Sequence, residues 1–173
     1  VAIIARARAA KTRLERLHHV LRELRRYTVL LFEKTENDPD TVDAWMAEEG
    51  FDYDSAGYFT ALPRQQAYRE GQDGADELSF YCPTQAAQTF EARFQMYALR
   101  NIGLVLKQVL ADLNGVEYIY FQGRTSIAVT HPYVDPAPIV PPDFTWEEYY
   151  SYRSVAADVN PEREVRWAWP SDD

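Results

Sequence analysis

A long amphipathic helix at the start of the chain is the feature that most restricts the fold. Over residues 5–34, mostly apolar residues recur at alternating spacings of three and four, which is the pattern of a heptad seam. The seam consists of Leu14, Leu17, Leu21, Leu24, Thr28 and Leu31. It can pack on the helix's own domain or pair with a helix of another chain. The sequence favours the first option, because a short heptad run does not by itself establish a coiled coil.

The charge of the chain is uneven. The formal net charge is −9, which argues against a general nucleic-acid binder, since phosphate contacts need clustered Lys and Arg. Residues 1–34 nevertheless carry nine Lys and Arg against three acidic residues. Two interpretations of this basic segment stay open: a solvated helix face, which is the commoner case, or a stem that contacts lipid headgroups.

The remainder of the chain predicts short helices and strands around one longer helix. We expect a short helix capped by Asp40 and ended by Gly50, and a long helix from Thr84 to Gly115. Strand patterns occur near 58–59, at 78–82, 116–122, 125–132 and 164–169, and residues 145–158 are helical in part. The turn at Gly123-Arg124 predicts a hairpin. This order indicates an α+β domain with a mostly antiparallel sheet.

The sequence contains no motif that specifies a reaction or a metal site. The three histidines and the single cysteine, Cys82, lack zinc-ligand spacing, and we expect Cys82 to be a buried thiol. The stretch "DYDSAG" begins like a calcium loop, but the twelfth position is Pro63, where a bidentate acid is needed. There is no glycine-rich phosphate loop and no nucleophile elbow. We therefore predict that the chain is not an enzyme and holds neither a cofactor nor a metal.

Aromatic residues make up 14% of the chain and are the main candidates for a binding role. In "VEYIYFQ" the alternation of a strand places Tyr118, Tyr120 and Gln122 on one face, and Ile119 and Phe121 on the core-facing side. Trp167 and Trp169 share a face of the last strand in the same way. Tyrosine and tryptophan suit small-molecule pockets, but aromatic clusters are more often core, and the residues alone leave both interpretations open.

Nearly the whole chain resembles a known family, and its carboxy-terminal part does so most specifically. "YIYFQGRTSIAVTHPYVDP" and "YYSYRSVAADVNPEREVRWAWPSDD" resemble the membrane-distal part of double Cache sensor domains. The resemblance is carried by a "YF…YP" strand pair and by a later "YY…AD…NPER…W" block. In this chain the matching residues are Tyr120, Phe121, Pro132 and Tyr133, then Tyr149, Tyr150, Ala157, Asp158, Asn160, Pro161, Glu162, Arg163 and Trp167.

This resemblance implies a PAS-like antiparallel sheet flanked by helices. Residues 1–35 would form a stem helix and residues 36–173 the membrane-distal sensor module, without the membrane-proximal module. The domain would sense a small molecule on the periplasmic or extracellular side of the cell inner membrane. It would belong to a receptor with a histidine kinase, diguanylate cyclase or chemoreceptor output. The start "VAII" would then be the cut end of a transmembrane helix.

The ligand expected from the resemblance is an amine, an amino acid or a small carboxylate. An aspartate among aromatic rings suits an ammonium group, and an arginine suits a carboxylate. The family's amino-acid binders place an arginine and then a tryptophan in the strand pair, whereas Arg124 is followed by Thr125. The predicted ligand-binding residues are Tyr118, Tyr120, Gln122, Arg124, Tyr149, Tyr150, Tyr152, Trp167, Trp169 and Asp172. The alternative is a module that dimerises through the amino-terminal helix and has a vestigial pocket.

Overall fold

The computed structural model of the protein describes residues 2–72, 77–113, 115–123 and 125–135. Residues 2–33 and residues 34–135 belong to two different compact units, so each is described by itself. Within the described part of the chain, no helix has both the length and the apolar character needed to cross a membrane. The prediction of residues 136–173, including a partial helix and a last strand, lies outside the described residues.

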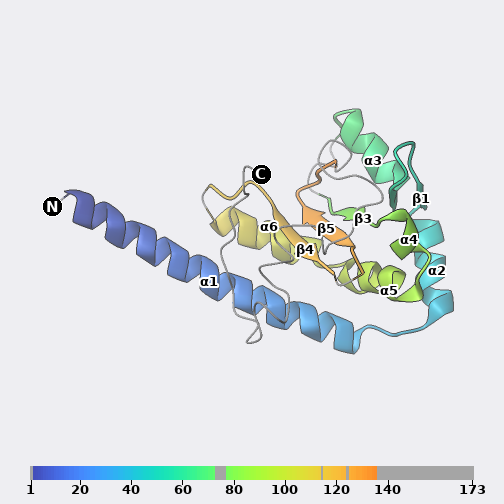
Figure 1. Ribbon diagram of the computed structural model, residues 1–173, viewed down its shortest axis with the longest axis horizontal. Coiled ribbons are helices and arrows are strands. Elements are labelled where there is room, and N and C mark those ends of the chain that lie inside the picture. Colours follow the sequence, from blue (N-terminus) through green and yellow to red (C-terminus); the bar gives the residue numbers. More distant parts are fainter. Residues whose placement is uncertain (1, 73–76, 114, 124, 136–173) are drawn as a thin grey trace. The chain divides into compact units, whose positions relative to one another are not determined.

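Helix α1 (Ala2–Lys34) is continuous over 33 residues, which confirms the predicted long helix (Figure 1). Two residues of its heptad seam are substantially exposed, Leu14 by 47% and Leu21 by 37%. Thr28 is the buried member of the seam, and its hydroxyl donates a hydrogen bond of 2.7 Å to the carbonyl oxygen of Leu24. This bond satisfies the threonine within the helix, as is common for Ser and Thr at helical positions.

The second unit contains two small antiparallel sheets, which confirms the α+β class. Strands β1 (Phe51–Tyr53) and β2 (Phe59–Ala61) form a hairpin. Strands β3 (Ser79–Tyr81), β4 (Ile119–Gln122) and β5 (Ala128–His131) form a sheet of order β3-β5-β4. An antiparallel bridge between Phe59 and Cys82 joins the two, with N–O distances of 3.0 and 3.1 Å. The hairpin predicted at Gly123 is confirmed as β4–β5.

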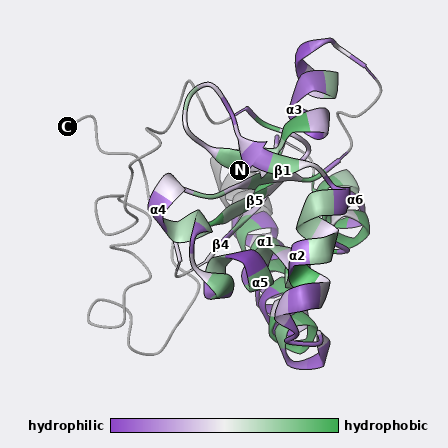
Figure 2. Cartoon of the chain, turned by 90° about the vertical axis from the view of Figure 1, so that its right-hand side faces the viewer, coloured by the Kyte–Doolittle hydropathy of each residue, from purple (hydrophilic) through white to green (hydrophobic). Residues whose placement is uncertain are grey.

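Helices α2 and α5 pack against each other beside these strands (Figure 1). Both carry hydrophilic as well as hydrophobic residues, as expected for helices with one solvated side (Figure 2). The bounds of the helices in this unit are α2 (Pro39–Glu48), α3 (Leu62–Arg69), α4 (Thr84–Ala87), α5 (Phe90–Leu99) and α6 (Gly103–Asp112).

An aromatic core lies between α2, α5 and one face of the strands. The ring of Phe80 on β3 is 5.8 Å from that of Trp45 on α2 and 5.7 Å from that of Phe51 on β1. Trp45 also meets Tyr97 on α5 edge to face, at 5.5 Å. Phe80 and Val129, which are paired across β3 and β5, are both fully buried. These contacts fix the apolar face of the sheet.

The single helix predicted from Thr84 to Gly115 is wrong, because the structure divides it into α4, α5 and α6. At the first break the Thr89 hydroxyl donates to the carbonyl oxygen of Ala86 and accepts from the Ala92 amide, so it caps the next helix. At the second break the Arg100 guanidinium donates to the Tyr97 carbonyl oxygen at 2.7 Å and lies over the Tyr97 ring. At each break, therefore, a side chain binds a backbone group at the helix end.

The predicted cap of the second helix is also wrong by two residues. Asp38, and not Asp40, accepts the amide of Thr41 at 2.9 Å and the Thr41 hydroxyl at 2.6 Å. Pro39 is then the first helical residue, a position where its missing N–H costs nothing. Helix α3 is not anticipated by the sequence analysis, although Pro63 in its first turn follows the same rule.

Candidate functional site

The face of the sheet opposite the aromatic core carries hydroxyl and amide groups. Ser79 on β3 is paired with Thr130 on β5, and Thr130 is paired with Tyr120 on β4. Directly paired residues of antiparallel strands point to the same face. These three side chains therefore form one polar row across the three strands.

A second row lies two residues further along the same face. It runs from Tyr81 on β3 through Ala128 on β5 to Gln122 on β4. Thr60 on β2 joins this face, because its neighbour Phe59 is bridged to Cys82 and so points to the opposite side together with Phe80. We call this surface the hydroxyl face, with Thr60, Ser79, Tyr81, Tyr120, Gln122 and Thr130 as its polar residues.

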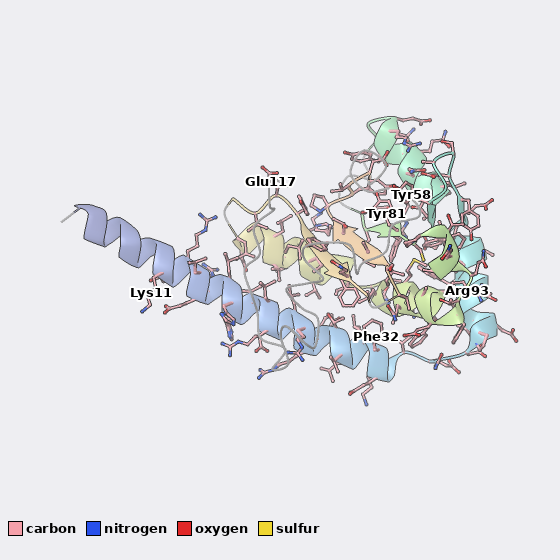
Figure 3. The ribbon with its side chains drawn as sticks, viewed as in Figure 1. Lys11, Phe32, Tyr58, Tyr81, Arg93 and Glu117 are labelled. Atoms are coloured by element: carbon pink, nitrogen blue, oxygen red, sulfur yellow. The ribbon has the colours of Figure 1, made fainter. Side chains whose placement is uncertain are left out.

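Three hydroxyl groups converge at the β2–β3 end of the hydroxyl face. They belong to Thr60, Tyr81 and Tyr133, whose residues are 1%, 6% and 4% exposed. The hydroxyl of Tyr133 neighbours those of Tyr81 and Thr60. Among the described residues, however, none of the three makes a hydrogen bond of good distance and angle. We call these three residues the hydroxyl cluster; Tyr58, whose ring lies 6.4 Å from that of Tyr81, borders it (Figure 3).

Helix α3 and the segment after β5 cover this cluster. The ring of Tyr68 on α3 lies 4.7 Å from that of Tyr133. One residue further on, the Arg69 guanidinium donates to the Asp135 carboxylate at 2.9 Å. The hydrogen bond from Arg69 to Asp135 raises the pKa of the arginine. The hydroxyl cluster therefore lies beside an ion pair whose two opposite charges neutralise each other.

The turn between β1 and β2 positions Tyr58, which borders the hydroxyl cluster, and Thr60, which belongs to it. The Asp54 carboxylate accepts the amides of Ala56 and Tyr58, each at 2.9 Å, and the side-chain amide of Gln65 at 2.8 Å. The stretch "DYDSAG" therefore forms a turn, in which the carboxylate of Asp54 binds peptide and amide groups of the chain itself. The turn fixes the direction of β2 and hence the position of Thr60.

Burial keeps the cluster's phenols protonated. Desolvation raises the pKa of Tyr133 to about 12, and it raises the pKa of Tyr81 further. The negative charge of Asp135 acts in the same direction on both residues. At physiological pH both groups are therefore neutral hydroxyls that can donate as well as accept a hydrogen bond.

Three of the predicted ligand-binding residues lie in the described part of the chain. Tyr118 and Tyr120 are 50% and 43% exposed, and their rings are 6.3 Å apart. Gln122 is half-buried. Tyr120 and Gln122 belong to the hydroxyl face, as their alternation with Ile119 and Phe121 predicted. The other predicted residues lie outside the described residues: Arg124, Tyr149, Tyr150, Tyr152, Trp167, Trp169 and Asp172.

The sequence analysis missed the hydroxyl cluster itself. A signal was present in "LSFYC", where strand alternation separates Ser79 and Tyr81 from Phe80. The meeting of Tyr81 with Thr60 and Tyr133 depends on pairings between strands far apart in the chain, which no local pattern reveals. Among the described residues, no three His, Cys, Asp or Glu side chains are grouped closely enough to hold a metal ion.

Comparisons of the chain with protein-family models, with curated proteins and with solved structures found no match.

Proposed function

We propose that this chain is a small-molecule-sensing domain that binds its ligand on the hydroxyl face of the sheet. The observation that carries the proposal is the hydroxyl cluster. Leaving a buried polar group without a hydrogen bond costs about 1–3 kcal/mol. The three hydroxyls neighbour one another without well-aligned bonds, so a ligand that supplies such bonds to Thr60, Tyr81 and Tyr133 would relieve part of this cost on binding. Aromatic rings that also carry hydroxyls are well suited to such a site.

The receptor context of the proposal rests on the resemblance of the "NPER" block and strand pair to double Cache sensors. In that context the domain faces the periplasmic or extracellular side of the cell inner membrane. The output is a histidine kinase, a diguanylate cyclase or a chemoreceptor. Ligand binding changes the output if one arrangement of the domain binds the ligand better than another.

A thermal-shift screen against amino acids, amines, small carboxylates, sugars and purines tests the proposal. Ligand at a hundredfold excess over its dissociation constant stabilises a protein by about 2.7 kcal/mol, which moves the melting temperature by several degrees. The response should be lost in Tyr81→Phe, which removes one hydroxyl of the cluster. It should persist in the control Tyr53→Phe, because Tyr53 pairs with Phe59 and so lies on the other face.

A protein that melts cooperatively and responds to none of these compounds contradicts the sensing proposal. A response that is unchanged in Tyr81→Phe would show that the ligand binds away from the hydroxyl cluster. Calorimetric titration of the responding compound then gives the affinity of each variant.

A second candidate function is dimerisation through α1. It is favoured by the exposure of Leu14 and Leu21, which share the heptad seam with Leu17 and Leu24. Leu21→Glu places a charge in the seam and should convert a dimer to a monomer in analytical ultracentrifugation. Glu23→Gln is the matched control, since Glu23 pairs with Arg26 on the same helix at 2.7 Å and lies outside the seam. A chain that is monomeric before either change excludes this candidate.

A further inference from the structure

The charges that border the hydroxyl cluster are already compensated. Arg69 and Asp135 neutralise each other at 2.9 Å. The Asp54 carboxylate accepts three hydrogen bonds, from two peptide amides and from Gln65. Burying an ion is expensive unless an opposite charge or several hydrogen bonds compensate it. Within the described residues, the cluster therefore offers no uncompensated charge to a ligand ion.

What the cluster does offer is neutral groups with both hydrogen-bonding functions. The hydroxyls of Thr60, Tyr81 and Tyr133 each provide one donor and acceptor lone pairs. Such a set suits a ligand group that both donates and accepts, such as an alcohol, an amide or a heterocyclic N–H beside a ring nitrogen. A carboxylate only accepts and an ammonium only donates, so each uses only one of the two hydrogen-bonding functions of the cluster.

The row that contains Tyr81 also includes one small side chain, that of Ala128. Ala128 lies between Tyr81 and Gln122 on the hydroxyl face, and its single methyl group is the smallest side chain of either row. A ligand group that lies beside Tyr81 on this face would lie over Ala128. A larger side chain at this position would project from the hydroxyl face and away from the aromatic core.

We infer that the ligand group held at the hydroxyl cluster is uncharged, donates and accepts hydrogen bonds, and lies over Ala128 beside Tyr81. This inference rests on the proposed sensing function and narrows its ligand to polar molecules with an uncharged binding group. Sugars, polyols, amides and nucleobases belong to this class.

The experiment compares two sets of compounds by thermal shift and calorimetric titration. The neutral set is glucose, myo-inositol, nicotinamide and adenine; the charged set is glutamate, arginine, putrescine and succinate. Each responding compound is then titrated into Tyr81→Phe and Ala128→Leu. We expect a response from the neutral set, with the affinity reduced roughly tenfold or more in both variants.

Two controls separate loss of binding from loss of folding. Ala128→Ser keeps the side chain small and should retain most of the affinity. Tyr81→Phe removes one oxygen and keeps the ring, so its own melting transition reports whether the domain is intact. If Ala128→Leu fails to fold, Tyr81→Phe alone still decides the result.

The outcomes distinguish a failure of this inference from a failure of the sensing function on which it rests. A charged compound whose binding depends on Tyr81 overturns the inference and leaves the sensing function in place. A neutral compound whose affinity is the same in Tyr81→Phe also overturns it. No response from either set, with a cooperatively melting protein, contradicts the sensing function and the inference together.

Discussion

The carboxylate of Asp54 accepts a hydrogen bond of 2.8 Å from the side chain of Gln65, which is only 2% exposed. This bond joins the β1–β2 turn to α3, the helix that covers the hydroxyl cluster. The same carboxylate holds the amides of Ala56 and Tyr58. One side chain therefore sets the shape of the turn and the position of the helix above it.

Replacing Asp54 by alanine should lower the free energy of unfolding at pH 7 by about 1–3 kcal/mol, because a buried amide loses its partner. Burial opposes ionisation of Asp54, but the hydrogen bonds from Gln65, Tyr58 and Ala56 outweigh it and lower the pKa of the carboxyl. A lowered pKa in the folded state stabilises the protein above the unfolded pKa of about 4, and this contribution is lost as the pH falls.

Urea denaturation of the original protein and Asp54→Ala at pH 7 and at pH 3 measures this effect. The difference between the two proteins should shrink at pH 3. Asp52→Ala is the control, since Asp52 is exposed and its carboxylate accepts the amide of the adjacent Tyr53. An equal loss in Asp52→Ala, or a difference that does not depend on pH, contradicts the role assigned to Asp54.

Tyr81→Phe should leave the stability of the ligand-free protein unchanged or raise it. The substitution removes a buried hydroxyl that lacks a well-aligned hydrogen bond among the described residues, and it preserves the ring packing. The melting temperature and the urea midpoint measure the change. A loss of more than about 1 kcal/mol would mean that the hydroxyl is bonded in the ligand-free protein.

Gly123→Ala should destabilise the β4–β5 hairpin by about 1–3 kcal/mol, as overpacking does. A Cβ atom at this position would lie 2.6 Å from Cγ1 of Ile127 and would also collide with the side chain of Gln95. Gly103→Ala is the control, because the atoms nearest to its Cβ would belong to Leu78, with the closest at 3.2 Å. Equal stabilities of the two variants in urea denaturation would contradict this packing.

Cys82 should react with a disulfide reagent only after the domain unfolds. The side chain is fully buried, and burial raises the pKa of its thiol to about 12, so the reactive thiolate is scarce at pH 8. The rate of reaction with Ellman's reagent should rise steeply across the urea transition. Rapid, complete reaction without denaturant would show that the β2–β3 junction opens in the native protein.

Local patterns in the sequence were sufficient to predict helix α1 and the two faces of β4. The apolar residues of α1 repeat with the helical period, and helical hydrogen bonds join residues four apart. A short window of the sequence therefore contains the information that predicts this helix. Alternation likewise separated Tyr118 and Tyr120, which are exposed, from Ile119 and Phe121, which are half-buried.

The breaks in the helix predicted from Thr84 to Gly115 were not predicted, because the apolar stripe continues through them. The two breaks coincide with the cap formed by Thr89 and with the contact of Arg100 with Tyr97. In both contacts a side chain binds one of several backbone groups within its reach, and helix propensity alone does not predict which one.

By itself, the sequence determined the α+β class, the helical start and the antiparallel hairpin at Gly123. Only the tertiary structure brought Thr60, Tyr81 and Tyr133 together, from positions on β2, on β3 and after β5. The pairing of β3 with β5, which places Tyr81 beside Ala128, joins residues 47 positions apart in the chain. Such pairings are set by the burial of a whole sheet face and not by neighbouring residues, so the hydroxyl cluster is a property of the assembled sheet.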